Sequence, residues 1–204
     1  MIDKMTFGEI SFFTADSAPY GQTYGNWTVK WWKWFLLTPK SINTGEYTYV
    51  NQQSKHILFL TGKLANEDTN LPDRFCTIST GTSILFPVIN CEVNSLEYPE
   101  LKTHQDLIER VKRDEDTIIK KECSVNGKRI PAQRVKSDPL VFELRINEDN
   151  AFNVKGGGTT RASSDGYWVF LKPLPVGKHI ISFQGSCEYG KLNSGANYHL
   201  QVVE

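Results

Sequence analysis

Short apolar segments with a period of two run through most of the chain after residue 56. Residues 141–146 show it most clearly, because Phe142, Leu144 and Ile146 fall on one side and polar residues alternate with them. Similar segments lie at 56–60, 83–89, 167–171, 179–183 and 198–203, and Asn126-Gly127 predicts a hairpin turn within 118–134. This spacing predicts a mainly β chain folded as an antiparallel β-sandwich, jelly-roll-like or immunoglobulin-like.

Two segments depart from this pattern and predict helices. Thr23 is placed to cap a helix that runs to about Thr38, before Pro39. Its apolar side chains cover most of the helical circumference and leave polar strips at Lys30 and Lys33, so we expect a buried helix. Residues 100–116 form an amphipathic pattern that predicts one surface helix.

Composition narrows the classes of function. The 23 Lys and Arg balance the 23 Asp and Glu, so no general attraction to nucleic acid is expected. No apolar segment is long enough to span a membrane, and residues 1–13 lack a signal-peptide pattern. We expect a soluble single domain over residues 1–204, with 1–18 as an N-terminal extension or edge segment. The oligomeric state stays open.

Metal and cofactor sites are not indicated. The four cysteines show no CxxC pair and no histidine at zinc-finger spacing, so no metal and no cofactor is expected. Cys76 and Cys91 flank one strand-like segment and could form a disulfide. The alternative is that all the cysteines are buried thiols.

Four of the five tryptophans lie in one eight-residue stretch inside the first predicted helix: Trp27, Trp31, Trp32 and Trp34. Packing is one interpretation, because large aromatic side chains bury much apolar area. A second is that one or two indoles line a cleft and stack on a sugar, with Lys30 contacting an anionic group. An exposed interaction patch is the third.

Two long motifs carry a resemblance to a known family. They are YG-x2-YG-x-W-x2-KWW-x-W, which begins at Tyr20, and SDGYWVFL-x-PL-x2-G-x-H, which begins at Ser164. With Phe59-Leu60-x-Gly62 and Ile84–Asn90, they make the chain from about residue 18 onward resemble a family of small uncharacterised microbial proteins. The resemblance implies no activity. Because such proteins often look exported, it implies an extracellular or cell-surface location.

Candidate site residues lie near the ends of predicted strands. Asp165 and Trp168 follow a glycine-rich loop, and His179 begins a strand, where it is a candidate general base, a candidate metal ligand or a half-buried polar residue. Asn90, Glu92 and Glu97 follow another strand; paired carboxylates suit glycoside hydrolysis, whereas a solvated loop is the simpler interpretation.

Together these observations favour a non-catalytic binding or surface-associated module for a carbohydrate or other small polar ligand. The candidate ligand-binding residues are Trp27, Lys30, Trp31, Trp34, Glu92, Asp165, Trp168 and His179. One alternative is a hydrolase that uses Asp165, Glu92 and His179 at the loop end of the sandwich, with Lys30 as an anion contact. The other is a structural component of a larger assembly.

Overall fold

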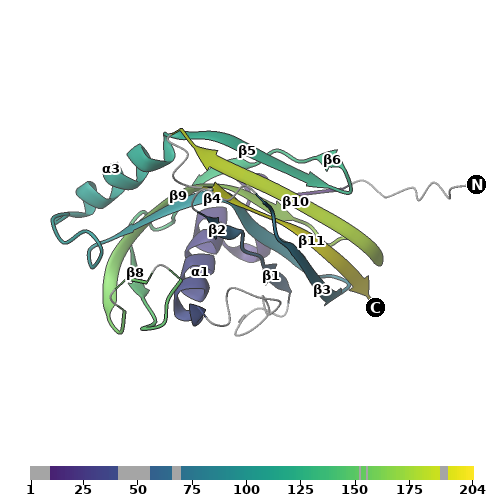
Figure 1. Ribbon diagram of the computed structural model, residues 1–204, viewed down its shortest axis with the longest axis horizontal. Coiled ribbons are helices and arrows are strands. Elements are labelled where there is room, and N and C mark those ends of the chain that lie inside the picture. Colours follow the sequence, from purple (N-terminus) through teal and green to yellow (C-terminus); the bar gives the residue numbers. More distant parts are fainter. Residues whose placement is uncertain (1–9, 41–55, 66–69, 152, 155, 189–192) are drawn as a thin grey trace, which may run out of the picture.

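In the part of the chain that the structure describes, two packed β-sheets and two main helices make up the fold (Figure 1). The computed structural model describes residues 10–40, 56–65, 70–151, 153–154, 156–188 and 193–204. Sheet A contains β1 (Ile57–Phe59), β4 (Ser83–Asn94), β7 (Gln133–Lys136), β8 (Phe142–Arg145) and β9 (Thr159–Leu171). Sheet B contains β2 (Lys63–Ala65), β3 (Asp73–Ser79), β5 (Ile118–Val125), β6 (Lys128–Arg129), β10 (Gly177–Cys187) and β11 (Asn193–Val203). The predicted mainly β sandwich is confirmed.

Most neighbouring strands are antiparallel, but two pairs at the sheet edges are parallel. Sheet A has the order β1-β4-β9-β7, with β8 also on β9; sheet B has the order β2-β11-β10-β5-β6, with β3 also on β11. The parallel pairs are β1 with β4 and β3 with β11. The predicted antiparallel sandwich therefore includes two parallel pairs at its edges. Alternation along a strand shows which side chains are buried, but it does not show the direction of the partner strand.

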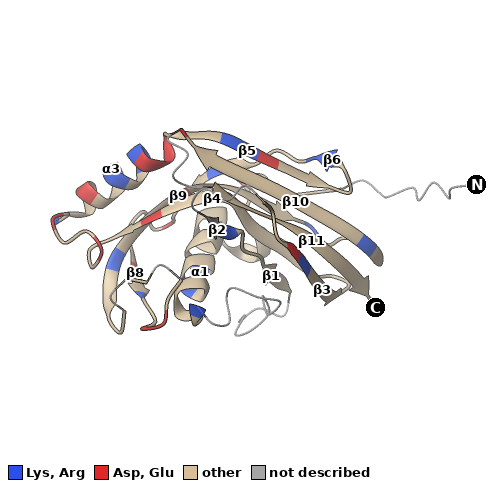
Figure 2. Ribbon diagram, viewed as in Figure 1, with Lys and Arg blue, Asp and Glu red and all other residues tan. Residues whose placement is uncertain are grey.

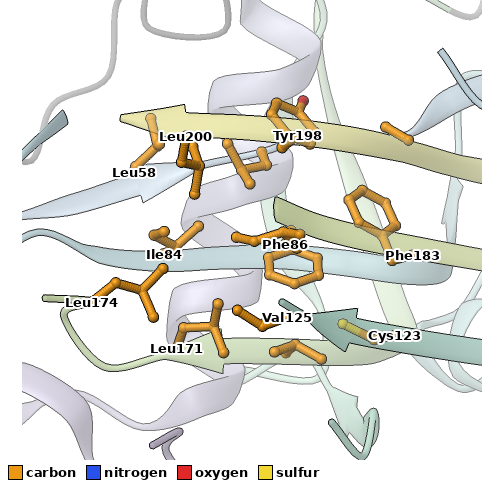
Figure 3. Close-up of a cluster of buried hydrophobic side chains, with 14 of the residues drawn as sticks. Leu58, Ile84, Phe86, Cys123, Val125, Leu171, Leu174, Phe183, Tyr198 and Leu200 are labelled. Atoms are coloured by element: carbon orange, nitrogen blue, oxygen red, sulfur yellow. The ribbon is translucent and has the colours of Figure 1, made fainter. Parts of the chain in front are cut away.

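The core between the sheets comes from alternate side chains of both. Figure 3 shows Ile84 and Phe86 of β4 among side chains from sheet B that include Phe183 and Tyr198. The rings of Phe86 and Phe183 lie 4.8 Å apart, centre to centre. The hairpin predicted at Asn126-Gly127 joins β5 and β6, and both turn residues have the positive φ angles that a type I′ turn requires.

Helix α1 (Tyr24–Leu37) covers the other face of sheet A. Thr23 caps it by accepting a hydrogen bond from the Asn26 amide at 3.1 Å. All four of its tryptophans are at most 7% exposed, and Trp31 packs edge-on against Trp168 of β9 at 5.3 Å between ring centres. The indoles are therefore mainly core side chains, which is the packing interpretation.

The described part of the N-terminal segment lies against the same layer. Phe12 forms a backbone bridge to Leu171, and Phe13 packs on the ring of Phe170 at 4.9 Å. A short 3-10 turn at Pro19–Gly21 then leads into α1. The remainder of the predicted 1–18 segment, residues 1–9, is outside the described residues.

Helix α3 (His104–Glu115) is the predicted surface helix. Thr103 and Asp106 form a capping box at its start, and Leu107 and Val111 pack against Val93 of β4. Acidic and basic residues occupy several other positions along the helix (Figure 2). The helix begins about four residues later than predicted, because residues 98–101 form a turn after β4.

A bulge in β4 exchanges the faces of its side chains. The pairing with β9 shifts between Pro87 and Ile89. Before the bulge, Leu85 faces α1; after it, Asn90 and Glu92 occupy that side, and Cys91 and Val93 face α3. The bulge therefore directs polar side chains toward the aromatic helix.

Candidate functional site

A cavity of about 340 Å³ lies beside the second half of β4. Strand β1 pairs with β4 only at residues 83–85. Beyond residue 85, no described strand pairs with β4 on that edge, so β4 forms the edge of sheet A there. Helix α1, loop 61–62, β11 and the turn after β4 surround the opening. We call it the edge pocket; its lining includes Trp31, Trp32, Phe35, Thr61, Gly62, Asn90, Cys91, Glu92, Glu97, Tyr98, Asp114 and Ser194.

Asn90 and Gly166 form one side of the edge pocket. They are direct partners across β4 and β9, and a Cβ atom at Gly166 would lie 2.5 Å from the Asn90 Cβ and 2.7 Å from the Trp168 Nε1. The missing side chain therefore lets the Gly166 backbone pack closely against both side chains. The Nδ2 of Asn90 is buried, and within the described structure it has no hydrogen-bond acceptor.

Farther along the chain from Asn90, the carboxylates of Glu92 and Glu97 share one neutral hydrogen-bond donor, the side-chain amide of Asn94. The Nδ2 of Asn94 donates to the Oε2 of Glu92 at 3.4 Å and to the Oε2 of Glu97 at 3.3 Å. Asn94 also accepts from the backbone amides of Leu96 and Glu97, which fixes the turn that carries Glu97. The Oε1 of Glu92 is buried and has no partner among the described residues.

Burial changes the protonation of this pair. Loss of solvent raises the pKa of Glu92 to about 8, and the negative charge of Glu97 adds to the shift, while the Asn94 hydrogen bond opposes it. The pKa of Glu97 is also raised, mainly by partial burial. Glu92 is consequently a protonated carboxylic acid at neutral pH.

An ion pair and a tyrosine ring border the acidic end of the pocket. The Nε of Arg110 donates to both carboxylate oxygens of Asp114, at 3.1 and 2.9 Å, and the guanidinium lies 4.5 Å from the centre of the Tyr98 ring. Arg110 is thus engaged by Asp114, and it forms no ion pair with Glu92 or Glu97 in the described structure.

The opposite wall is held by buried hydrogen bonds. The Nε1 of Trp31 donates to the Leu60 carbonyl at 2.9 Å. Behind Thr61, the Nη1 of Arg74 donates to the Thr61 carbonyl and hydroxyl at 2.7 Å each and to the Tyr198 hydroxyl at 2.8 Å. These contacts attach the 60–62 loop to sheet B, so this wall is preorganised.

A second polar cluster is buried on the other face of β4. Asp165, 2% exposed, forms an ion pair with Arg134 at 2.8 Å, and Arg134 also binds Asp116 at 2.6 Å. Beside it, both carboxylate oxygens of Glu115 are buried, and among the described residues neither has a hydrogen-bond partner of standard geometry. Burial, reinforced by the charge of Asp165, raises the pKa of Glu115 to about 9. This cluster secures α3 to the sheet.

The structure brings only some of the predicted ligand-binding residues together. Glu92 and Trp31 line the edge pocket, together with Asn90 and Glu97. Trp168 lies beneath it, next to Gly166.

The other predicted site residues on α1 do not line the edge pocket. The Nε1 of Trp27 donates to the Pro19 carbonyl at 2.8 Å, and Trp34 packs on Phe59 at 5.6 Å. The Nζ of Lys30 lies 4.3 Å from the centre of the Trp27 ring, and burial lowers the pKa of Lys30. The lysine strip is therefore an edge of the helix and no part of this pocket.

The residues of the predicted hydrolase do not converge. Asp165 points to the α3 side of sheet A and Glu92 to the α1 side, because their positions on paired strands are offset by one residue. His179, 3% exposed, lies in sheet B, where its Nδ1 contacts the Asn126 side chain and its Nε2 contacts the Pro175 carbonyl. Among the described residues, no group of His, Cys, Asp and Glu could hold a metal ion.

Two further expectations from the sequence concern a disulfide bond and membrane-spanning helices. All four cysteines are thiols, so the Cys76–Cys91 disulfide was wrong: Cys76 faces the core between the sheets and Cys91 faces α3. None of the helices in the described ranges has the length and apolar character needed to cross a membrane.

Sequence reasoning missed several members of the site: Asn94, Tyr98, Arg110 and Asp114. Asn94 and Tyr98 had a usable signal, because they share the short segment that holds Glu92 and Glu97. Arg110 and Asp114 had none beyond the i,i+4 spacing of an ordinary helical ion pair.

Comparisons with known proteins add little to this site. No family model matches the chain, and no curated protein matches it. One solved structure with weak likeness is that of PbICP-C in complex with falcipain-2; the match covers 72% of this chain and 99% of that chain, at 12% identity and a TM-score of 0.32. A likeness this low supports no conclusion about fold family or function. The resemblance to a microbial family stays a prediction.

Proposed function

We propose that the chain is a non-catalytic binding module that holds a carbohydrate or other small polar ligand in the edge pocket. The observation that carries the proposal is that two buried polar atoms of residues lining this pocket, the Nδ2 of Asn90 and the Oε1 of Glu92, have no hydrogen-bond partner among the described residues. Buried donors and acceptors are nearly always satisfied in folded proteins, so an unsatisfied pair indicates that something outside the chain completes them.

The surroundings of these atoms suit a small ligand. The cavity, about 340 Å³, is within the usual range of ligand sites, and its walls combine aromatic rings with convergent polar groups. Rings of Trp31, Trp32 and Tyr98 offer faces or edges for the apolar side of a sugar, and Asn90 and Glu92 offer hydrogen bonds for its hydroxyl groups.

Intrinsic tryptophan fluorescence tests this proposal. A panel of neutral and amino monosaccharides and disaccharides is titrated into the wild-type chain, and at least one should change the emission saturably. Trp32→Phe should remove most of the change. Trp34→Phe is the matched control, because Trp34 is equally buried on α1 but does not line the pocket. No saturable response to any sugar, or equal loss in both variants, contradicts the proposal.

The paired carboxylates favour a second candidate, a glycoside hydrolase. Both Oε2 atoms lie within 3.4 Å of the same Asn94 nitrogen, so the carboxyl groups are close enough to flank one glycosidic bond. Glu92, protonated at neutral pH, would donate a proton to the leaving group, and Glu97 would act as base or nucleophile. Hydrolysis of 4-nitrophenyl glycosides that disappears in both Glu92→Gln and Glu97→Gln would establish this candidate; no hydrolysis leaves the binding module.

A further inference from the structure

The acidic end of the edge pocket holds more acidic side chains than basic ones. Glu92, Glu97 and Asp114 line it, and Arg110 is the cation that lies against them. Asp114 already engages Arg110 with two hydrogen bonds. Among the described residues, Glu92 and Glu97 then share the neutral Asn94 amide as their hydrogen-bond donor, at 3.4 and 3.3 Å, and Arg110 acts on Glu97 only through its charge.

Other charged groups around the pocket do not compensate this pair. Arg74 is behind Thr61, and its donors go to Thr61 and Tyr198. On α1, Lys30 lies over Trp27 and Lys33 is exposed, and neither lines the cavity. The site is therefore built to accept a cation from outside the chain.

The remaining groups specify what kind of cation fits. An ammonium group has three donors, which matches the unsatisfied Oε1 of Glu92 and the carboxylate of Glu97. Asn90 precedes Glu92 by two residues, so both point to the same side of β4. Its buried Nδ2 needs an acceptor, which a hydroxyl oxygen beside the ammonium group supplies.

Aromatic side chains complete the arrangement. Trp31, Trp32, Phe35 and Tyr98 line the same cavity. Their rings attract a cation and pack on the apolar face of a sugar ring, whereas an isolated acidic surface would attract hydrated metal ions without selecting either feature.

We propose that the edge pocket recognises a protonated amine with a neighbouring hydroxyl group, as in an amino sugar, with the ammonium at Glu92 and Glu97 and the oxygen at Asn90. The inference rests on the binding function proposed above and names its ligand class. In the empty pocket Glu92 keeps its proton; when the ammonium enters, the carboxyl ionises and one proton leaves to solvent, so the net charge of the site is the same in both states.

Calorimetry with matched sugars tests the amine. The pairs are D-glucosamine with D-glucose, D-galactosamine with D-galactose, and N-acetyl-D-glucosamine as a neutral relative of the first. At pH 7 the amines should bind at least tenfold tighter than their hydroxyl partners, with the acetylated sugar resembling glucose. Titrations in buffers of different ionisation enthalpy should show release of close to one proton per amine bound.

The pH dependence gives a second readout. Between pH 5.5 and 7, Glu92 is mostly protonated in the empty pocket, so amine affinity should rise up to about tenfold per pH unit. Glu97, Asp114, Arg110 and Tyr98 face Glu92 from the turn and α3, and Glu97 adds to the same trend because its pKa is also raised. Neutral sugars should show little change.

Variants separate this inference from the underlying function. Glu92→Gln should remove the amine preference and the proton release, whereas Glu143→Gln, an exposed carboxylate on β8, should keep both. Glu97→Gln, at an exposed position, should reduce the preference for amines over their hydroxyl partners. This variant tests the inference if Glu92→Gln does not fold. Amines and hydroxyl partners that bind equally overturn the amine assignment and leave the binding module; no binding by any of the sugars overturns both.

Discussion

Asn90 on β4 is directly opposite Gly166 on β9, and because Gly166 has only a hydrogen atom in place of a side chain, its backbone lies in close contact with the Asn90 Cβ and the Trp168 Nε1. This contact shapes one side of the edge pocket. It depends on the bulge at Pro87–Ile89, which turns Asn90 and Glu92 toward α1. Both the fold and the site therefore depend on this small region.

Gly166→Ala should destabilise the protein by about 1–3 kcal/mol, because the new methyl group would meet atoms at 2.5 and 2.7 Å in a close-packed layer. Urea denaturation measures the change. Gly158→Ala is the control, since its methyl group would meet only Leu96 at an ordinary 3.7 Å. Equal stability of the two variants would show that the layer has room to adjust.

Arg134→Met should destabilise the protein by roughly 3–5 kcal/mol, because it leaves the buried Asp165 carboxylate without its cation. Asp165→Asn in the same chain should restore much of the loss, since it removes the stranded charge. Arg145→Met, at an exposed position on β8, serves as the control. A double variant no more stable than Arg134→Met alone would indicate that the arginine acts through packing.

Tyr198→Phe should cost about 1–3 kcal/mol, because Arg74 and the Thr61 backbone lose a buried hydroxyl partner. The Thr61 wall of the edge pocket should also loosen, which amide hydrogen exchange at residues 60–62 would report. Unchanged exchange with lowered stability would place the effect in sheet B alone.

Stability should fall as the pH rises from about 5 to 8. Burial raises the pKa of Glu92 to about 8 and that of Glu115 to about 9, so in this range the folded protein binds more protons than the unfolded chain. Each group contributes a slope of up to about 1.4 kcal/mol per pH unit, and its stabilisation is fully present below the unfolded pKa. Denaturation in urea at several pH values measures the slope.

Single variants assign that slope to its groups. Glu115→Gln and Glu92→Gln should each flatten the curve between pH 5 and 8, because each removes a group that loses its proton on unfolding. The lowered pKa values of Asp106 and Asp116 act only at more acidic pH. A curve that rises through this range, or that neither variant changes, contradicts the assigned protonation states.

The sequence pattern predicted the strands and helices better than it predicted which strands pair within each sheet. Alternation of apolar and polar residues predicted strands such as Phe142–Arg145. The apolar residues around most of the circumference of α1 predicted a buried helix that contains the tryptophans. The parallel pairing of β1 with β4 was not accessible, because alternation carries no information on strand direction. The bulge had one sequence signal, Pro87, because a proline inside a strand is typical of a bulge, but the proline does not show which face the later side chains of β4 take.

The site was predictable only in part. Glu92 and Glu97 drew attention because carboxylates after a strand often converge, and the structure does place them on one amide. Asp165 and His179 were chosen for their chemistry, but tertiary packing placed them in a structural ion pair and in sheet B. Asp114 reaches the pocket from α3, and only long-range packing decides that.

Side-chain NMR with isotope-labelled protein tests the central claim most directly. On titration with D-glucosamine, the Nδ2 resonances of Asn90 and the indole resonances of Trp31 and Trp32 should shift saturably, while those of Trp27 and Trp34, which are buried on the same helix but lie outside the edge pocket, should stay in place. Shifts confined to other residues, or no saturable shift at Asn90, would show that the edge pocket is not the ligand site.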